Sequence, residues 1–371
     1  GSLIMHSLRM LIGDEAFFES VTRLVYGRPD PRPGNFEPRY ASTPDFLAIV
    51  NEVTGQDLVA YLDPRLFKPL GIAGYDWEKS PQGLNTAGYG LRVKTEDIAK
   101  FGQLYLQKGQ WQGKQLLPAS WIEEATSKQT ESQPGDGDWS QGYGYQFWRC
   151  KPGFYRGDGA YGQFCFVMPE QDAVLVMTSE SKDLQKSMNI AYDNLLPAFA
   201  KGELPENRVQ VAFLKKELSQ LALAPAQGID TPENVDKYSD KRFEMAENPY
   251  GIKYLSVGLY PKNCVLKMES PKGVEKITFG WNEWVLNSQE SKIRFPVPTR
   301  LEIPSKVAGS AAWLDDHTLL LKMKYVEAIH GDTLTLTFEN NAVAVAFLNS
   351  VTEKTKSFPE KREKLTGTLR A

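Results

Sequence analysis

"YRGDGAYGQFCFVMPEQDAVLVMTSES", residues 155–181, is the stretch that decides the fold of the first half of this sequence. Apolar and polar side chains alternate on both sides of residues 169–172, Pro-Glu-Gln-Asp. This period of two predicts an antiparallel hairpin that turns at those four residues. The first strand of the hairpin carries Gly157, Gly159 and Gly162. Glycine weakens a strand, so its repetition indicates either a bulged strand or a backbone that a bound molecule approaches closely.

The residues around the hairpin predict a mixed region of helices and sheet. Residues 143–150 and 154–169 each have the pattern of one strand, and residues 172–180 complete an antiparallel sheet with them. Helices are expected where apolar side chains recur at helical spacing between capping signals, at residues 2–13, 14–27, 42–55, 56–72, 94–109, 116–129 and 183–201.

The pattern changes near residue 236. Residues 201–235 contain one more amphipathic helix and a linker. Further on, short alternating strands recur between turn signals, at residues 241–247, 252–260, 263–270, 274–281, 318–327, 332–340 and 342–349. That spacing predicts a separate all-β barrel or sandwich. The expected fold class is therefore α+β, with a helical N-terminal segment, a partial antiparallel sheet with helices, and then the all-β domain.

The composition excludes several classes of partner. The chain of 371 residues is 41% hydrophobic and 24% charged, with a net charge of −3 and no basic run, so nucleic acid is not an expected partner. No apolar stretch approaches the roughly 20 residues of a membrane span. The N-terminus begins inside an apolar pattern without an initiator Met, so we expect that the true N-terminus is absent.

Neither a disulfide framework nor a metal site is expected. Cys150, Cys165 and Cys264 are odd in number and have no paired spacing, which favours free thiols. The three histidines have no ligand spacing, so no metal and no cofactor is predicted. A cytoplasmic location is slightly favoured, and the sequence does not indicate an oligomeric state.

Four segments in order resemble the serine β-lactamase and penicillin-binding-protein-like hydrolases. They are "YLDPRLFKPLGI", "SPQGLNTAGYGLRVKTEDIAKFGQLYLQKGQWQGKQLLP", "DWSQGYGYQFWRC" and the glycine-rich hairpin. The resemblance covers residues 59–200, and residues 236–371 resemble the β domain appended in an esterase-like branch of the family, with residues 201–235 as helix and linker. It implies hydrolysis of a small ester, amide or D-amino-acid peptide through an acyl-enzyme.

In this family the strand of the hairpin that corresponds to the glycine-rich one here borders the active site. Its Lys/His-Thr-Gly motif aligns with Gly157, Asp158 and Gly159, and the next N–H, on Ala160, would be an oxyanion-hole donor. Gly157 stands where Lys or His often occurs, so Arg156 or Asp158 would supply polarity. Substrate contacts are also expected from Gln163 and, across the cleft, from Asn85, Gly88 and Tyr89. Alternatively, the glycines bend a bulged strand and the loop around residue 85 only caps a helix.

The nucleophile of the family, in a Ser-x-x-Lys motif at a helix start, has no counterpart at the expected place. The only Ser-x-x-Lys, residues 179–182, follows the hairpin and is interpreted as a solvated turn. Tyr40-Ala41-Ser42 echoes the second family motif, in which Tyr40 would transfer a proton.

Residues 1–58 contain "GSLIMHSLR", "IGDEAFF" and "STPDF". Through these segments they resemble instead the helical end of a gluzincin zinc aminopeptidase, without its zinc ligands, and Tyr40 would then be an ordinary loop residue. The sequence leaves three functions open: a serine hydrolase that lacks its nucleophile, a non-catalytic protein that binds peptides or cell-wall-like ligands, and the remnant of a zinc peptidase.

Overall fold

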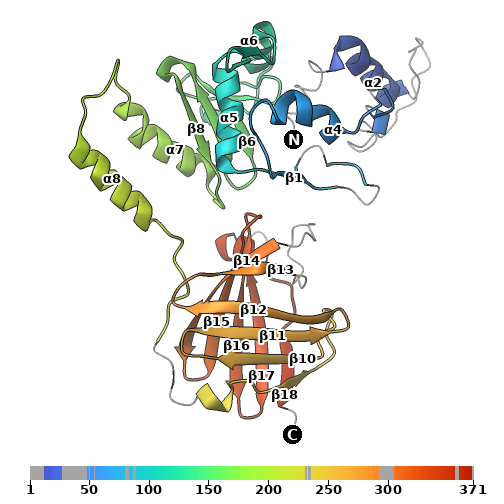
Figure 1. The fold of residues 1–371 in the computed structure, drawn as a ribbon, viewed down its shortest axis with the longest axis vertical. Coiled ribbons are helices and arrows are strands. Elements are labelled where there is room, and N and C mark those ends of the chain that lie inside the picture. Colours follow the sequence, from blue (N-terminus) through green and yellow to red (C-terminus); the bar gives the residue numbers. More distant parts are fainter. Residues whose placement is uncertain are drawn as a thin grey trace. The chain divides into compact units, whose positions relative to one another are not determined.

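The computed structural model describes residues 12–26, 48–49, 51–53, 55–79, 83–86, 89–229, 232, 235–291, 305–355 and 359–369. Contacts divide the chain into two units, Gly1–Lys201 and Gly202–Ala371, and each is described by itself (Figure 1). Among the described helices, none is both long and apolar enough to cross a membrane.

A four-stranded antiparallel sheet organises the first unit. Its strands lie in the order β5 (Trp148–Arg149), β6 (Tyr155–Gly159), β7 (Gln163–Met168) and β8 (Ala173–Met177). The predicted turn between β7 and β8 is confirmed, since a short 3-10 helix follows β7 and Asp172 then takes a left-handed conformation at φ 47°. The antiparallel sheet predicted from the alternation is therefore present.

The prediction of one unbroken strand over residues 154–169 is wrong. The chain turns back at Ala160, Tyr161 and Gly162, so β6 and β7 pair with each other, with Gly159 opposite Gln163. The reason lies in the backbone, because Tyr161 and Gly162 have φ values of 63° and 88°, which no strand allows. The third glycine of the quoted stretch thus belongs to a tight turn.

Two helices cover opposite faces of this sheet (Figure 1). Cys165 and Val167 of β7 belong to one apolar cluster with α5 (Thr95–Leu106), whereas Phe164 and Phe166 belong to another with α7 (Leu184–Asn194). Period-two alternation along the strand produces this division. α7 is shorter than the predicted 183–201 helix, since a separate 3-10 turn, Leu196–Ala198, contains Pro197.

Gly102 allows α5 to approach the sheet closely. A Cβ built on it would lie 2.6 Å from a methyl carbon of Val174 and 2.8 Å from Sγ of Cys165. Shorter elements complete the unit: α2 (Asp14–Tyr26), α4 (Leu58–Leu62) with a π-helical turn (Asp63–Phe67), α6 (Ala119–Thr126), and the strand pairs β1 (Asp76–Trp77) with β2 (Leu91–Arg92) and β3 (Gln110–Trp111) with β4 (Lys114–Gln115).

The second unit contains α8 (Arg208–Gln220) and a closed β-barrel. The barrel strands are β9 (Phe243–Met245), β10 (Tyr254–Leu259), β11 (Asn263–Ser270), β12 (Gly273–Trp281), β14 (Ser305–Asp315), β15 (Thr318–Tyr325), β16 (Gly331–Glu339), β17 (Ala342–Asn349) and β18 (Leu365–Leu369). β12 pairs in parallel with β14 and closes the sheet, while β13 (Val285–Ser291) adds to β14. β9 lies between β10 and β18. The predicted α+β class with a separate all-β domain is confirmed.

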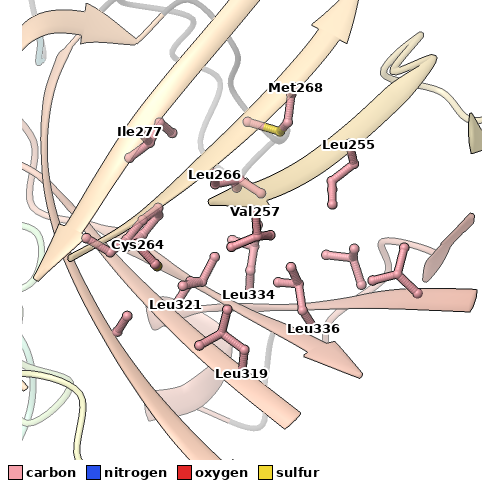
Figure 2. Packing of buried hydrophobic residues seen from close by; sticks show 14 of the residues in the cluster. Leu255, Val257, Cys264, Leu266, Met268, Ile277, Leu319, Leu321, Leu334 and Leu336 are labelled. Atoms are coloured by element: carbon pink, nitrogen blue, oxygen red, sulfur yellow. The ribbon is translucent and has the colours of Figure 1, made fainter. Parts of the chain in front are cut away.

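Apolar side chains fill the barrel interior (Figure 2). Leu266, Leu321, Leu334 and Leu336 have no exposed surface, and each contributes about 1.5–3 kcal/mol by burial. Near the start of β16, Arg362 donates from Nη2 to Asp332 at 2.7 Å and to Glu360 at 2.6 Å.

Candidate active site

The residues of β6, which carries Gly157 and Gly159, are divided between the two faces of the sheet. Phe154 packs in the cluster of α7 and Tyr155 in the cluster of α5. Because successive residues of a strand alternate between faces, Arg156 and Asp158 lie on the α7 face, and Gly157 lies on the α5 face. The α5 face of β6 therefore carries no side chain beyond Tyr155, since Gly159 also lies on it.

Arg156 is a fully buried cation. Its Nε donates to Oδ2 of Asp158 at 3.1 Å, and its Nη1 lies 3.2 Å from the carbonyl oxygen of Arg149 and 3.3 Å from Sγ of Cys150. The guanidinium carbon lies 4.8 Å from the ring centroid of Trp139. Sulfur, carbonyl and aromatic groups thus surround the guanidinium.

Burial of this pair changes the acidity of its members. Burial raises the pKa of Asp158, and the charge of Arg156 opposes that increase without cancelling it. Burial likewise raises the pKa of the Cys150 thiol, against the opposing effect of Arg156. Nη2 of Arg156 has no hydrogen-bond partner in the described part of the chain, so the cation is incompletely satisfied there.

The turn between β6 and β7 is tied to the loop after β8. Gln163 donates from Nε2 to the carbonyl oxygens of Ala160, at 3.2 Å, and Ser179, at 2.6 Å. The Ser179 hydroxyl lies 2.9 Å from the carbonyl oxygens of Tyr161 and Gly162. A side chain on Gly162 would collide with that hydroxyl. Ala160 is exposed at the turn, and its N–H has no hydrogen bond to any residue that the structure describes.

Ser179 therefore supports the turn, and the surrounding backbone differs from that of a helical Ser-x-x-Lys motif. Residues 178–183 form no helix, and α7 begins only at Leu184 with Asp183 as its N-cap. Lys182 is exposed. The two side chains therefore do not share a helical face, which is the arrangement that would let a lysine activate the serine.

A separate hollow of about 450 Å³ lies in the same unit. Its described lining comes from α4, the π-helical turn, β1 and the loop after β1: Asp57, Val59, Ala60, Asp63, Tyr75, Asp76, Trp77, Lys79 and Asn85. Asn85 is only 6% exposed, and its Nδ2 has no hydrogen-bond partner among the residues that the structure describes. No residue of 156–163 is among these lining residues.

Two of the carboxylates at the hollow are already neutralised. Asp63 accepts from Lys68 Nζ at 2.7 Å and from the Tyr75 hydroxyl at 2.8 Å, and these two hydrogen bonds lower its pKa. Burial and then the hydrogen bond to Asp63 raise the pKa of Tyr75 to about 12. Asp76 is paired with Arg92.

The other predicted site residues are distributed as follows. Tyr89 is 57% exposed, near Asn85 in the chain. Its carbonyl oxygen accepts from Thr86 Oγ1. Gly88 and Tyr40 lie outside the described residues. Within the described part of the chain, no group of three or more His, Cys, Asp and Glu side chains is arranged to hold a metal ion.

The comparison with protein families identifies the first unit. Residues 19–198 match the family model described as beta-lactamase. This part of the chain belongs to the serine β-lactamase and penicillin-binding-protein-like family. A search of curated proteins finds no match.

Solved structures with similar folds have low identity to the chain. The putative 6-aminohexanoate-dimer hydrolase from Bacillus anthracis is 20% identical, with a TM-score of 0.35 and 56% of each chain covered. An octameric penicillin-binding protein homologue from Pyrococcus abyssi is 13% identical, with a TM-score of 0.31, 98% of this chain covered and 74% of that one. A fatty-acid-binding protein from Drosophila melanogaster brain tissue is 12% identical, with a TM-score of 0.25 and 36% of this chain and 99% of that one covered. The assignment rests on the family match, and the chain spans about half of the first of these structures.

The expected aminopeptidase character of residues 1–58 is not borne out, because the β-lactamase match already begins at residue 19. Sequence reasoning also missed the hollow and the aromatic enclosure of Arg156. The hollow combines three separate segments, so no local pattern indicates it. The sequence did contain a signal for the ion pair of Arg156 and Asp158, since opposite charges two residues apart lie on one face of a strand.

Proposed function

We propose that the chain carries one wall and the oxyanion side of an acyl-transfer site for a small ester, amide or peptide, and lacks the attacking serine. The family match and the exposed turn at Ala160 support this proposal. An N–H without a partner directly after a strand can donate to a developing oxyanion, which is worth about 3 kcal/mol in enzymes that use it.

Arg156 and Asp158 act in this proposal as positioning residues. Both are buried on the face of β6 opposite to Gly157, and their ion pair holds the strand that leads to Ala160. Gly157 and Gly159 leave the α5 face of β6 without side chains, so that a flat ligand can contact the backbone there. Gln163 holds the turn through its two hydrogen bonds to carbonyl oxygens.

The conformation at Ser179 is the observation that supports the proposed absence of a nucleophile. The only Ser-x-x-Lys sequence of the chain lies in a loop, with its hydroxyl directed to two carbonyl oxygens and its lysine exposed. Oxyanion donors and a binding surface without a nucleophile leave about 10³–10⁴-fold of rate enhancement over water, far less than an intact triad provides.

Covalent labelling tests the proposal. The full chain is incubated with a fluorophosphonate and, separately, with a penicillin, and intact mass is measured against a serine β-lactamase as positive control. We expect no stoichiometric adduct on the chain. Labelling of wild type that is lost in Ser179→Ala would identify Ser179 as a nucleophile and contradict the proposal. An adduct that persists in Ser179→Ala would reveal another nucleophile and contradict it equally.

A further inference from the structure

The four-stranded sheet of the first unit has one covered border and one open border. At the β5 border, bridges join Trp148 to Tyr143 and Tyr143 to Thr130, so further chain continues the sheet there. At the other border, β8 pairs with β7 and with no other strand in the described part of the chain. Alternate residues of a strand direct their backbone N–H and C=O groups to opposite sides, so part of this backbone points away from β7. Residues 173–177 form no other backbone hydrogen bond with the described residues.

β8 also lacks the features that protect an open strand edge. Its sequence, Ala-Val-Leu-Val-Met, contains no charge and no proline, whereas natural edge strands commonly carry lysine, proline or a bulge. Its register with β7 runs without a shift, so no bulge twists the strand away. Every residue of β8 is partly exposed, although nearly all of the neighbouring β7 is buried. An apolar edge of this kind is a template for a further strand.

We propose that the open edge of β8 pairs with β8 of a second copy of this chain. The two strands run antiparallel about a two-fold axis that passes through Leu175, and the two sheets become one continuous sheet. In this register Leu175 lies opposite its own counterpart. Val174 lies opposite Val176 of the other copy. Ala173 lies opposite Met177 of the other copy.

The side chains of β8 are complementary to themselves in this register. Val174 and Val176 pack in the cluster on the α5 face of the sheet. Ala173, Leu175 and Met177 pack in the cluster on the α7 face. A two-fold axis perpendicular to the sheet leaves each face on its own side, so every cross-strand pair joins apolar side chains of the same face. Pairing therefore extends both apolar clusters across the axis.

The position of α5 also suits this arrangement. Gly102 of α5 lies against both β7 and β8, because a side chain built on it would meet Cys165 and Val174 at similar distances. Two helices related by the axis would then lie about two strand spacings apart, or roughly 10 Å. That separation is typical of packed helices. The α5 helices of the two copies are thus placed to pack on one face of the joined sheet.

Disulfide trapping in the full chain locates the pairing. A cysteine in place of Leu175 lies on the axis, with its Cα about 4.5–5.5 Å from that of the other copy, which is within disulfide range. We expect Leu175→Cys to become mostly covalent dimer under mild oxidation, as measured by intact mass. Lys114→Cys on the exposed β4 should remain mostly monomeric, and the three native cysteines are buried. A Leu175→Cys variant that forms covalent dimer no faster than Lys114→Cys would overturn the proposal.

Sedimentation velocity over a concentration series measures the association itself. Asp172 and Thr178 are exposed, and in the proposed register each lies opposite the other across the axis. Thr178→Asp therefore creates two like-charge pairs in each dimer and should weaken association at least about fivefold relative to the neutral Thr178→Asn. Circular dichroism checks that both variants are folded, and they decide the matter if Leu175→Cys does not fold. A wild-type chain that stays monomeric up to about 100 µM, or equal association of the two Thr178 variants, would also overturn the proposal.

Discussion

Arg156→Met tests how the β6 edge is held. The Arg156 side chain has no exposed surface and that of Asp158 is 8% exposed, so the substitution leaves a carboxylate buried without its cation. Removing one partner of a buried ion pair destabilises a protein by about 3–5 kcal/mol. Lys108→Met breaks a surface pair with Glu123, whose side chains are 66% and 62% exposed, and should change stability by less than about 1 kcal/mol.

Urea unfolding followed by tryptophan fluorescence measures these differences. Trp139 lies against the guanidinium, and five of the eight tryptophans belong to the first unit, so the signal reports mainly on that unit. Asp158→Asn added to Arg156→Met should restore part of the lost stability, with a coupling of about 0.5–3 kcal/mol. The deficit of Arg156→Met should also shrink as pH falls, because the folded-state pKa of Asp158 is already raised and protonation removes its buried charge. If Arg156→Met unfolded at the same urea concentration as Lys108→Met, the reasoning would be refuted.

Three further predictions concern the turn, the barrel and the thiols. Gly162→Ala should destabilise the first unit by about 1–3 kcal/mol through its positive φ and its collision with Ser179, as measured by urea unfolding, whereas a stable variant would show that the turn adapts. Burial raises the pKa of Glu360, but hydrogen bonds with Arg362 outweigh this and lower it to about 2. The barrel should therefore lose stability as pH falls from about 4.5 toward 2, and Glu360→Gln should flatten that dependence in acid titrations followed by circular dichroism. The three buried cysteines should not react with Ellman's reagent until denaturant is added, and rapid reaction of the native chain would contradict their burial.

The sequence predicted most barrel strands because their side chains alternate strictly. β15 and β17 alternate between fully and partly buried residues along their whole length, so a period of two indicates them. β14 was missed because residues 309–313 are all buried, where it pairs with β13, β15 and β12. A strand enclosed in this way loses its alternation, and its small residues then resemble no particular element.

The sequence predicted the candidate site less completely than the barrel, because the site depends on turn conformations and on the burial of side chains from distant segments. The glycines of residues 157–162 indicated a special backbone, yet the sequence did not reveal that the chain reverses there. A left-handed Tyr161 was the obstacle, since such a conformation is uncommon for a bulky residue. Asn85 was expected as a wall residue, but its burial without a hydrogen-bond partner among the described residues depends on packing between distant segments.

The pairing of β9 with β18 has a consequence for synthesis of the protein. Phe243 lies opposite Leu369, so β9, the first barrel strand to be synthesised, pairs with β18, the last one to be synthesised. This pairing cannot form until β18 has left the ribosome. Until β18 is available, the backbone N–H and C=O groups along one edge of β9 are unpaired, and they can pair with a neighbouring nascent chain. Chaperones that shield newly made polypeptides would therefore matter most for this half of the molecule, during the interval before its final strand is translated.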